Sequence, residues 1–290
     1  MKRLIAVALM ISLPLSACSM DTYPTNSPSA SASTSATATI QPTKPVVTST
    51  LIIQPSLTAT VSATSTPTTT KIAIKTYRMD EKYDIVPIDP NGNKKVLLLT
   101  FDDGPKDKSM IEPMLDILEK HNAKAIFFLN GYRIKQKPEL LKLLHERGQI
   151  IGNHAWDHIQ LKKETNEKID QQLRDVQVIV KEITGNTPVF FRPPFASYNN
   201  YVKAAAKSEK MLFMTWSNGS LDWDLENKGF SVETKAAAVI TNIMKLLHSG
   251  SNILMHELPW TVQALDDLLT QLEAKGYTFV DPQSIDTEME

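Results

Sequence analysis

Two adjacent aspartates follow an apolar run in this chain of 290 residues. Val96–Leu99 is typical of a buried strand, and it leads into Thr100–Pro105, which reads TFDDGP. Burying unpaired carboxylates is costly, so acids at this place indicate a chemical use, such as a metal ligand beside a free base. Neighbouring residues of an extended strand point to opposite sides, which predicts different roles for Asp102 and Asp103. The alternative is a solvated turn, because Asp, Gly and Pro also gather in ordinary turns.

Two histidines four residues apart, His154 and His158, are the next candidates. If this segment forms one helical turn, both imidazoles face the same way and can share a metal ion. With Asp103 they would give two histidines, one carboxylate and an open position, which is the arrangement of catalytic zinc sites. The alternative is a pair of unrelated surface histidines.

Three further polar residues stand at or after predicted strands. Arg192 lies between two phenylalanines and two prolines, so we expect it to be partly buried and to need an anion, for which Asp102 is the natural partner. His256 ends an apolar run and enters from the core, where Asp222 could pair with its ring and hold one tautomer. The alternatives are a surface cation and a histidine that merely satisfies the core.

Strands alternate with helices through the second part of the chain. The predicted strands are Lys95–Phe101, Ala125–Leu129, Gln149–Gly152, Val189–Arg192, Met211–Trp216, Asn252–His256 and Tyr277–Val280. The predicted helices run from Pro138 to a stop at Gly148, from Ile169 to a stop at Gly185, from Val232 to His248, and from Val262 to Lys275 with a stop at Gly276. This alternation predicts a parallel α/β fold, and about seven units predict a distorted (β/α)7–8 barrel with its site at the carboxyl ends of the strands. An open doubly wound sheet is the alternative, but no glycine-rich phosphate loop follows the first strand.

The N-terminal part has the features of an export signal and a linker. Residues 1–17 combine Lys2 and Arg3, a short apolar run and small residues, which predicts a signal peptide. Leu15–Cys18 resembles a bacterial lipobox, which implies cleavage before Cys18 and lipidation of that residue. An ordinary secretory signal is the alternative. We expect residues 18–75 to be a disordered linker rich in Ser, Thr and Pro, and residues 76–290 to be the catalytic domain.

The overall composition excludes some partners. The formal net charge is −1, so there is no electrostatic reason to expect nucleic acid binding. Cys18 is the one cysteine of the chain, which leaves the domain without an internal disulfide.

The motifs together resemble those of the NodB-homology polysaccharide deacetylases, carbohydrate esterase family 4. The resemblance runs in order from about Lys95 to Val280. Its five motifs are Thr100–Pro105 in full, Asn153–His158 in both histidines and the tryptophan, Arg192–Ala196 loosely, most of Ser220–Trp223, and Leu254–Glu257.

This resemblance implies a metal centre and a base. Asp103, His154 and His158 would bind Zn²⁺ or another divalent metal such as Co²⁺, which polarises an acetamide carbonyl and lowers the pKa of water. Asp102 would take a proton from the attacking water, and Arg192 would orient Asp102.

The resemblance also implies an acid and a pocket. His256, supported by Asp222, would protonate the departing amine. The backbone N–H of Phe195 would hold the oxyanion, and Trp223 and Leu254 would form the walls for the acetyl methyl group.

The resulting expectation is a monomeric enzyme that is lipid-anchored to the bacterial cell membrane through Cys18 and faces the cell wall. It would remove N-acetyl groups from N-acetylglucosamine in a wall polysaccharide, foremost peptidoglycan, and release acetate. The alternatives are deacetylation of chitin oligosaccharides, a secondary wall polysaccharide or O-acetyl xylan, and, in another class, an inactive glycan-binding lipoprotein. Four departures from the family pattern affect the expected rate and substrate range: Ala155, Ala196, Gly219 and Glu257.

Overall fold

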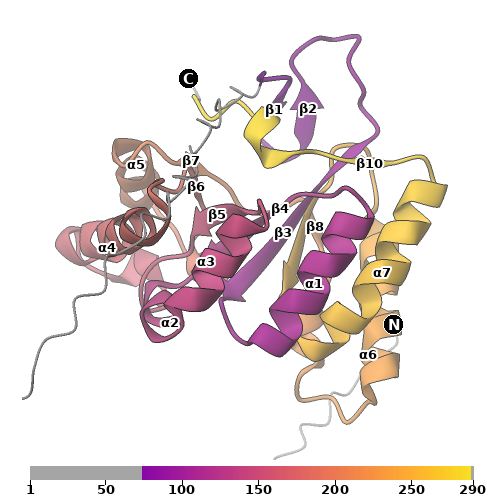
Figure 1. Ribbon diagram of the computed structural model, residues 1–290. Coiled ribbons are helices and arrows are strands. Elements are labelled where there is room, and N and C mark those ends of the chain that lie inside the picture. The colour runs from indigo at the N-terminus through magenta and orange to yellow at the C-terminus, as the bar shows by residue number, and fades with distance from the viewer. Residues whose placement is uncertain (1–73, 289–290) are drawn as a thin grey trace, which may run out of the picture. The chain divides into compact units, whose positions relative to one another are not determined.

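A parallel sheet curls part of the way round a barrel (Figure 1). The computed structural model describes residues 74–288; the expected signal peptide, Cys18 and nearly all of the expected linker lie outside this range. The strands are β3 (Val96–Gly104), β4 (Ala125–Leu129), β5 (Ile150–Asn153), β6 (Phe190–Phe191), β7 (Leu212–Phe213), β8 (Asn218–Gly219), β9 (Asn252–His256) and β10 (Thr278–Phe279). Their order is β7-β6-β5-β4-β3-β9-β8, with β10 beside β3, and every pair is parallel. The predicted distorted α/β barrel is confirmed.

Helices cover the outside of this sheet. They are α1 (Lys108–Lys120), α2 (Gly131–Gln136), α3 (Pro138–Glu146), α4 (Asn166–Thr184), α5 (Asn200–Ser208), α6 (Val232–Leu246) and α7 (Pro259–Ala274). They pack side by side round the outside in the order α6, α7, α1, α3, α4 and α5 (Figure 1). Helix α4 begins where the Thr165 hydroxyl accepts the N–H of Lys168 and ends at Gly185, whose φ of +78° suits glycine. None of the helices described is long and apolar enough to cross a membrane.

The alternation of side chains along β3 decides what the barrel interior contains. Leu97, Leu99 and Phe101 pack into the core beneath the helices. Val96 and Leu98 face the other way and pack with residues of β4, β6 and β7. Thr100 and Asp102 continue that inner row, so the interior changes from apolar to polar toward the carboxyl end of the strand.

A strand pair that the sequence analysis did not predict covers the amino end of the barrel. β1 (Tyr77–Met79) pairs antiparallel with β2 (Ile85–Pro87), at the end of the sheet away from the arrowhead of β3 (Figure 1). Met79 and Ile85 are buried in the same cluster as Leu98. The apolar end of the interior is therefore closed, and the polar end is left for a site.

Three predicted strands are shorter than expected, and the last of them, Tyr277–Val280, is reduced to β10. The run Val189–Arg192 is reduced to β6 because Pro193 and Pro194 follow it and have no N–H for a ladder. The run Met211–Trp216 is reduced to β7, since the chain then leaves the sheet and turns the Thr215 carbonyl toward Arg192. The predicted strands Ala125–Leu129 and Asn252–His256 match the structure residue for residue.

Candidate active site

The side chains of Asp102 and Asp103 both face the ring of His154. Nε2 of His154 lies 3.7 Å from an Asp102 oxygen and 3.3 Å from Asp103 Oδ1. The expectation that the two carboxylates point to opposite sides is wrong, because the strand is irregular here. The pairing of β3 with β4 shifts register between Asp102 and Gly104, and Asp103 has a φ of +67°. This bulge turns the Asp103 side chain back toward the interior.

His154 and His158 also meet at Asp103, although their segment is not helical. Their Nε2 atoms lie 3.3 and 2.9 Å from Asp103 Oδ1. The helical turn considered from the spacing is not formed, because Ala155 and His158 have left-handed backbones with φ of +59° and +53°. A loop of this shape brings the two rings together instead, with centroids 5.2 Å apart.

Buried amides hold this loop. Asn130 Nδ2 donates to the carbonyl of His154 at 2.7 Å, and Asn153 Oδ1 accepts the N–H of Ala155 at 2.9 Å. Gln172 both accepts the N–H of Asp157 at 2.8 Å and donates to its carboxylate at 2.7 Å. These three amides therefore fix the loop around Ala155, whose methyl side chain offers no hydrogen bond of its own. Sequence reasoning missed these amides, although Asn130 and Asn153 directly end or follow predicted strands.

The Asp103, His154 and His158 cluster suits a divalent cation. One ligand atom from each residue lies within 4.8 Å of the others. Asp103 Oδ1 is buried between the two Nε2 atoms, and no well-aligned hydrogen bond from a described residue reaches it. His154 Nδ1 must donate to the Arg192 carbonyl 2.7 Å away, which leaves the Nε2 lone pair facing the cluster. Burial raises the pKa of Asp103, but the two rings outweigh it and hold that pKa well below its ordinary value.

Arg192 is fully buried and pairs with Asp102. Its Nη1 donates to Asp102 Oδ1 at 2.7 Å, and its guanidinium carbon lies 4.4 Å from the centre of the Phe128 ring. Burial lowers the pKa of Arg192, and the Asp102 carboxylate opposes this. The pair anticipated from the sequence is present.

His256 and Asp222 form a second buried pair. Nδ1 of His256 lies 2.7 Å from Asp222 Oδ1. Asp222 Oδ2 accepts the backbone N–H of His256 at 2.7 Å and the hydroxyl of Thr261 at 2.8 Å. Burial lowers the pKa of His256, but the charge and hydrogen bond of Asp222 outweigh it, so the pKa of His256 is raised.

Both carboxylates, both loop histidines and His256 line one cavity of about 350 Å³. The lining residues are Asp102, Asp103, His154, His158, Pro193, Phe195, Trp216, Trp223, Leu254 and His256. Phe195 contacts the His158 ring with centroids 4.5 Å apart, and Trp223 contacts the His256 ring at 5.2 Å. Sequence reasoning missed Trp216, which packs edge-on against Trp223. All the residues anticipated for the site, apart from the buried Arg192 and Asp222 behind it, line this cavity.

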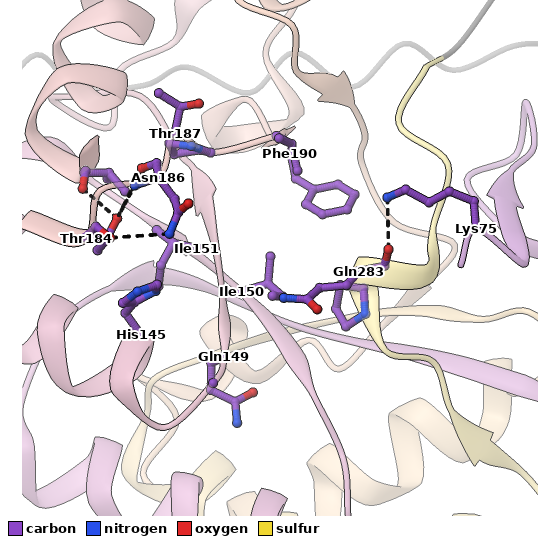
Figure 2. Close-up of a pocket in the computed structure, with 15 residues that line it drawn as sticks. Lys75, His145, Gln149, Ile150, Ile151, Thr184, Asn186, Thr187, Phe190 and Gln283 are labelled. Atoms are coloured by element: carbon purple, nitrogen blue, oxygen red, sulfur yellow. Dashed lines mark hydrogen bonds between the residues drawn. The ribbon is translucent and has the colours of Figure 1, made fainter. Parts of the chain in front are cut away.

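A larger cavity of about 530 Å³ lies elsewhere, at the amino ends of β5 and β6 (Figure 2). Its polar groups bond to one another: Asn186 N–H donates to the Thr184 hydroxyl, and Lys75 Nζ donates to the Gln283 carbonyl at 2.9 Å. It contains none of the residues singled out from the sequence, so its size does not make it the site of the chemistry.

Comparisons with known proteins all point to one family. A family model described as polysaccharide deacetylase matches residues 89–213. The peptidoglycan-N-acetylglucosamine deacetylase PgdA of Listeria monocytogenes is 38% identical over 189 residues, which are 65% of this chain and 38% of that protein. The chain thus spans well under half the length of this relative.

Two further proteins match over a larger share of their own length. A CE4 family pseudoenzyme from Bacillus anthracis has a similar structure, with a TM-score of 0.59 and 28% identity over 64% of this chain and 63% of that chain. The peptidoglycan-N-acetylmuramic acid deacetylase PdaA of Bacillus subtilis is 34% identical over 211 residues, which are 72% of this chain and 76% of that protein. A match of this extent, together with the family model, shows that the chain belongs to the polysaccharide deacetylase family.

Proposed function

We propose that this protein is a metal-dependent hydrolase that removes N-acetyl groups from N-acetylglucosamine in peptidoglycan and releases acetate. The observation that carries the proposal is one cavity that contains both a candidate metal cluster and a candidate acid. Asp103, His154 and His158 line the same 350 Å³ space as Asp102 and His256. Amide hydrolysis needs a polarised carbonyl, a base for water and an acid for the amine, and this set supplies all three.

Asp103, His154 and His158 would hold Zn²⁺ or a similar ion, which supplies Lewis acidity toward the acetamide carbonyl and toward water. Asp102 accepts the proton of the attacking water. Its other oxygen is held by Arg192 at 2.7 Å, so the carboxylate keeps one orientation while it takes the proton.

His256 donates a proton to the amine as it leaves. Its Nδ1 faces Asp222, so the proton comes from Nε2. No hydrogen bond to another described residue occupies the Phe195 N–H, which leaves it for the oxyanion. Trp223 and Leu254 enclose the acetyl methyl group.

The lining of the cavity favours N-acetylglucosamine over N-acetylmuramic acid, although the two relatives are named for one sugar each. N-acetylmuramic acid carries a lactyl carboxylate. Among the described residues that line the cavity there is no lysine or arginine, and two aspartates are present. The lactyl carboxylate would find no cationic lysine or arginine side chain to pair with among these described lining residues, whereas a neutral sugar needs none.

An inactive glycan-binding protein remains the candidate from another class, because the similar fold of a pseudoenzyme means that fold alone does not decide activity. Metal content discriminates between the two candidates. A binding module has no use for a metal ion beside two carboxylates, whereas the hydrolase requires one.

We also propose that residues 1–17 are a signal peptide and that Cys18 is lipidated. Residues 18–75 would then join the anchor to the catalytic domain, outside the cytoplasm and beside the wall. A two-chain lipid anchor binds membranes stably, whereas one chain binds weakly. Cys18→Ala should therefore move the protein from the membrane fraction to the soluble fraction, and an unchanged distribution would exclude the anchor.

The substrate is tested by incubating the Zn²⁺-loaded protein with purified peptidoglycan and with chitin oligosaccharides. Acetate release is measured, and the digested glycan is analysed by mass to show which sugar lost its acetyl group. The proposal expects acetate from peptidoglycan and loss of mass on N-acetylglucosamine. Rapid reaction with chitin and none with peptidoglycan, or mass loss on N-acetylmuramic acid, would overturn the assignment of substrate.

A further inference from the structure

The guanidinium of Arg192 has an acceptor for each of its five N–H groups. Nε and Nη2 donate to the Thr215 carbonyl at 3.2 and 2.8 Å, and Nη2 also donates to Asn252 Oδ1 at 3.2 Å. Nη1 donates to the Thr100 hydroxyl at 2.8 Å and to Asp102 at 2.7 Å. Asp102 is the one charged acceptor in this set. The orientation of the Arg192 guanidinium is therefore set by three neutral acceptors, on Thr100, Thr215 and Asn252, as well as by the Asp102 carboxylate.

The Asn252 amide contacts both the Arg192 guanidinium and one of its acceptors, the Thr215 carbonyl. Its Oδ1 accepts from Arg192, and its Nδ2 donates at 3.1 Å to the same Thr215 carbonyl that accepts from Arg192. A guanidinium only donates and a carbonyl only accepts, so the chemistry permits one orientation of the amide. Asn252 is completely buried, at the first residue of β9, and no family motif includes it.

We propose that Asn252 is a positioning residue that acts through Arg192 on Asp102. This rests on the proposed function, in which Asp102 is the base. Without the Asn252 amide, one N–H of a fully buried cation loses its acceptor. The guanidinium then rotates toward the remaining acceptors, and the Asp102 carboxylate that it holds moves with it. Misplacement of a catalytic group by about 1 Å costs on the order of a hundredfold in rate.

The experiment compares Asn252→Leu with a matched buried asparagine. Asn218 is equally buried and donates to the Ile243 carbonyl at 3.0 Å, but it makes no bond to Arg192. Asn218→Leu therefore removes a buried amide of the same kind without touching the guanidinium. We expect Asn252→Leu to lower kcat roughly ten- to hundredfold with KM within about twofold of wild type, and Asn218→Leu to leave kcat within about twofold.

A second measurement does not depend on activity. The side-chain N–H signals of Arg192 in a ¹⁵N spectrum report whether the guanidinium is held. We expect these signals to shift or exchange faster in Asn252→Leu and to stay unchanged in Asn218→Leu. If wild type deacetylates no glycan, the proposed function fails, while this spectrum still tests the link between Asn252 and Arg192.

Thr100→Val provides a second variant if Asn252→Leu does not fold. It removes a different neutral acceptor of the same guanidinium, the hydroxyl that also donates to the Ile253 carbonyl at 2.6 Å. We expect the same loss of kcat with little change in KM. Where both variants fold, their double variant should lose less than the product of the single losses, because both act through one group. Unchanged Arg192 signals, or an equal loss of kcat in Asn218→Leu, would overturn the proposal.

Discussion

Asp222 holds both the side chain and the backbone of His256. One carboxylate oxygen lies 2.7 Å from Nδ1, and the other accepts the His256 N–H at 2.7 Å. Because a carboxylate accepts, Nδ1 carries a proton in both charge states of the ring, and Nε2 is the atom that titrates. His256 also lines the cavity, so its exchangeable proton is directed to where an amine would leave.

Replacing His256, the candidate general acid, should lower the rate by a predictable factor. General acid catalysis contributes about 10²–10⁴-fold, so His256→Ala should lower kcat by that amount. Its metal content should stay at the wild-type value, since His256 is outside the Asp103, His154 and His158 cluster. Near-normal turnover of His256→Ala would remove it from this role.

The Asp222 charge should set the alkaline limit of activity. The pKa of His256 is raised because the Asp222 carboxylate outweighs the effect of burial. Asp222→Asn removes that charge, so the pKa of His256 falls and the alkaline limb of kcat/KM moves to lower pH. Thr261→Val, which removes a neutral bond to the same carboxylate, should move the limb less. An alkaline limb that stays in place in Asp222→Asn contradicts this account.

Metal binding should depend on the loop histidines. Elemental analysis of the wild type should find one divalent ion per chain, and His154→Ala should lose it because that ring supplies one of three ligand atoms. His145→Ala is the matched control, since His145 lines the separate cavity of Figure 2 and should keep the metal. Full metal content in His154→Ala would refute the ligand set.

Asp102→Asn should keep its metal but lose both turnover and stability. The loss of turnover follows from the missing base. The loss of stability follows because Arg192, which is fully buried, would be left without a charged partner. Breaking a buried ion pair costs about 3–5 kcal/mol, which chemical denaturation in the presence of a chelator would measure. Asp103→Asn under the same conditions should cost much less, and equal losses would contradict the pairing argument.

A pair far from the site should make stability depend on pH. His248 Nε2 lies 2.7 Å from Asp84, which joins the turn before β2 to the segment before β9. Burial lowers the pKa of His248, but Asp84 outweighs it and the pKa is raised. The contribution of this pair to the stability of the fold is therefore complete below the ordinary histidine pKa. It is lost as the pH rises through the pKa of His248 in the folded state. Because His248 is partly exposed, Asp84→Asn should cost less than about 1 kcal/mol, at pH 5 and not at pH 9.

The sequence was sufficient for the fold, and the candidate site residues that it singled out lie in one cavity or directly behind it, since both results depend on local patterns. Consecutive apolar residues such as Ile253, Leu254 and Met255 mark strands whose carboxyl ends must meet in a parallel barrel. Helix α1 was missed, although Asp107 caps it and Ile111, Leu115 and Leu118 form its buried face. Pro113 in its interior weakened that pattern.

The geometry of the site depends on features that no local pattern reports. The reversal of Asp103 follows from one backbone angle, and the acceptor at Thr215 is a backbone carbonyl. Asn252 and Arg192 are 60 residues apart in the chain, and their bond exists because β9 and β6 face one interior. Contacts of this kind form between residues that are distant in the sequence, so they can be seen only in the folded structure.

The left-handed backbone at Asp103 means that the candidate metal ligand lowers the stability of the fold. An aspartate with φ of +67° carries conformational strain of roughly 1 kcal/mol, which a glycine would relieve. Asp102 and Arg192 would remain paired after such a change, and the cavity with Phe195 and Trp223 would remain open. Asp103→Gly should therefore give a stable protein that retains its groove and lacks the carboxylate. The fold and the groove can thus survive the loss of Asp103, so a measurement of stability alone does not report whether the candidate metal site is intact.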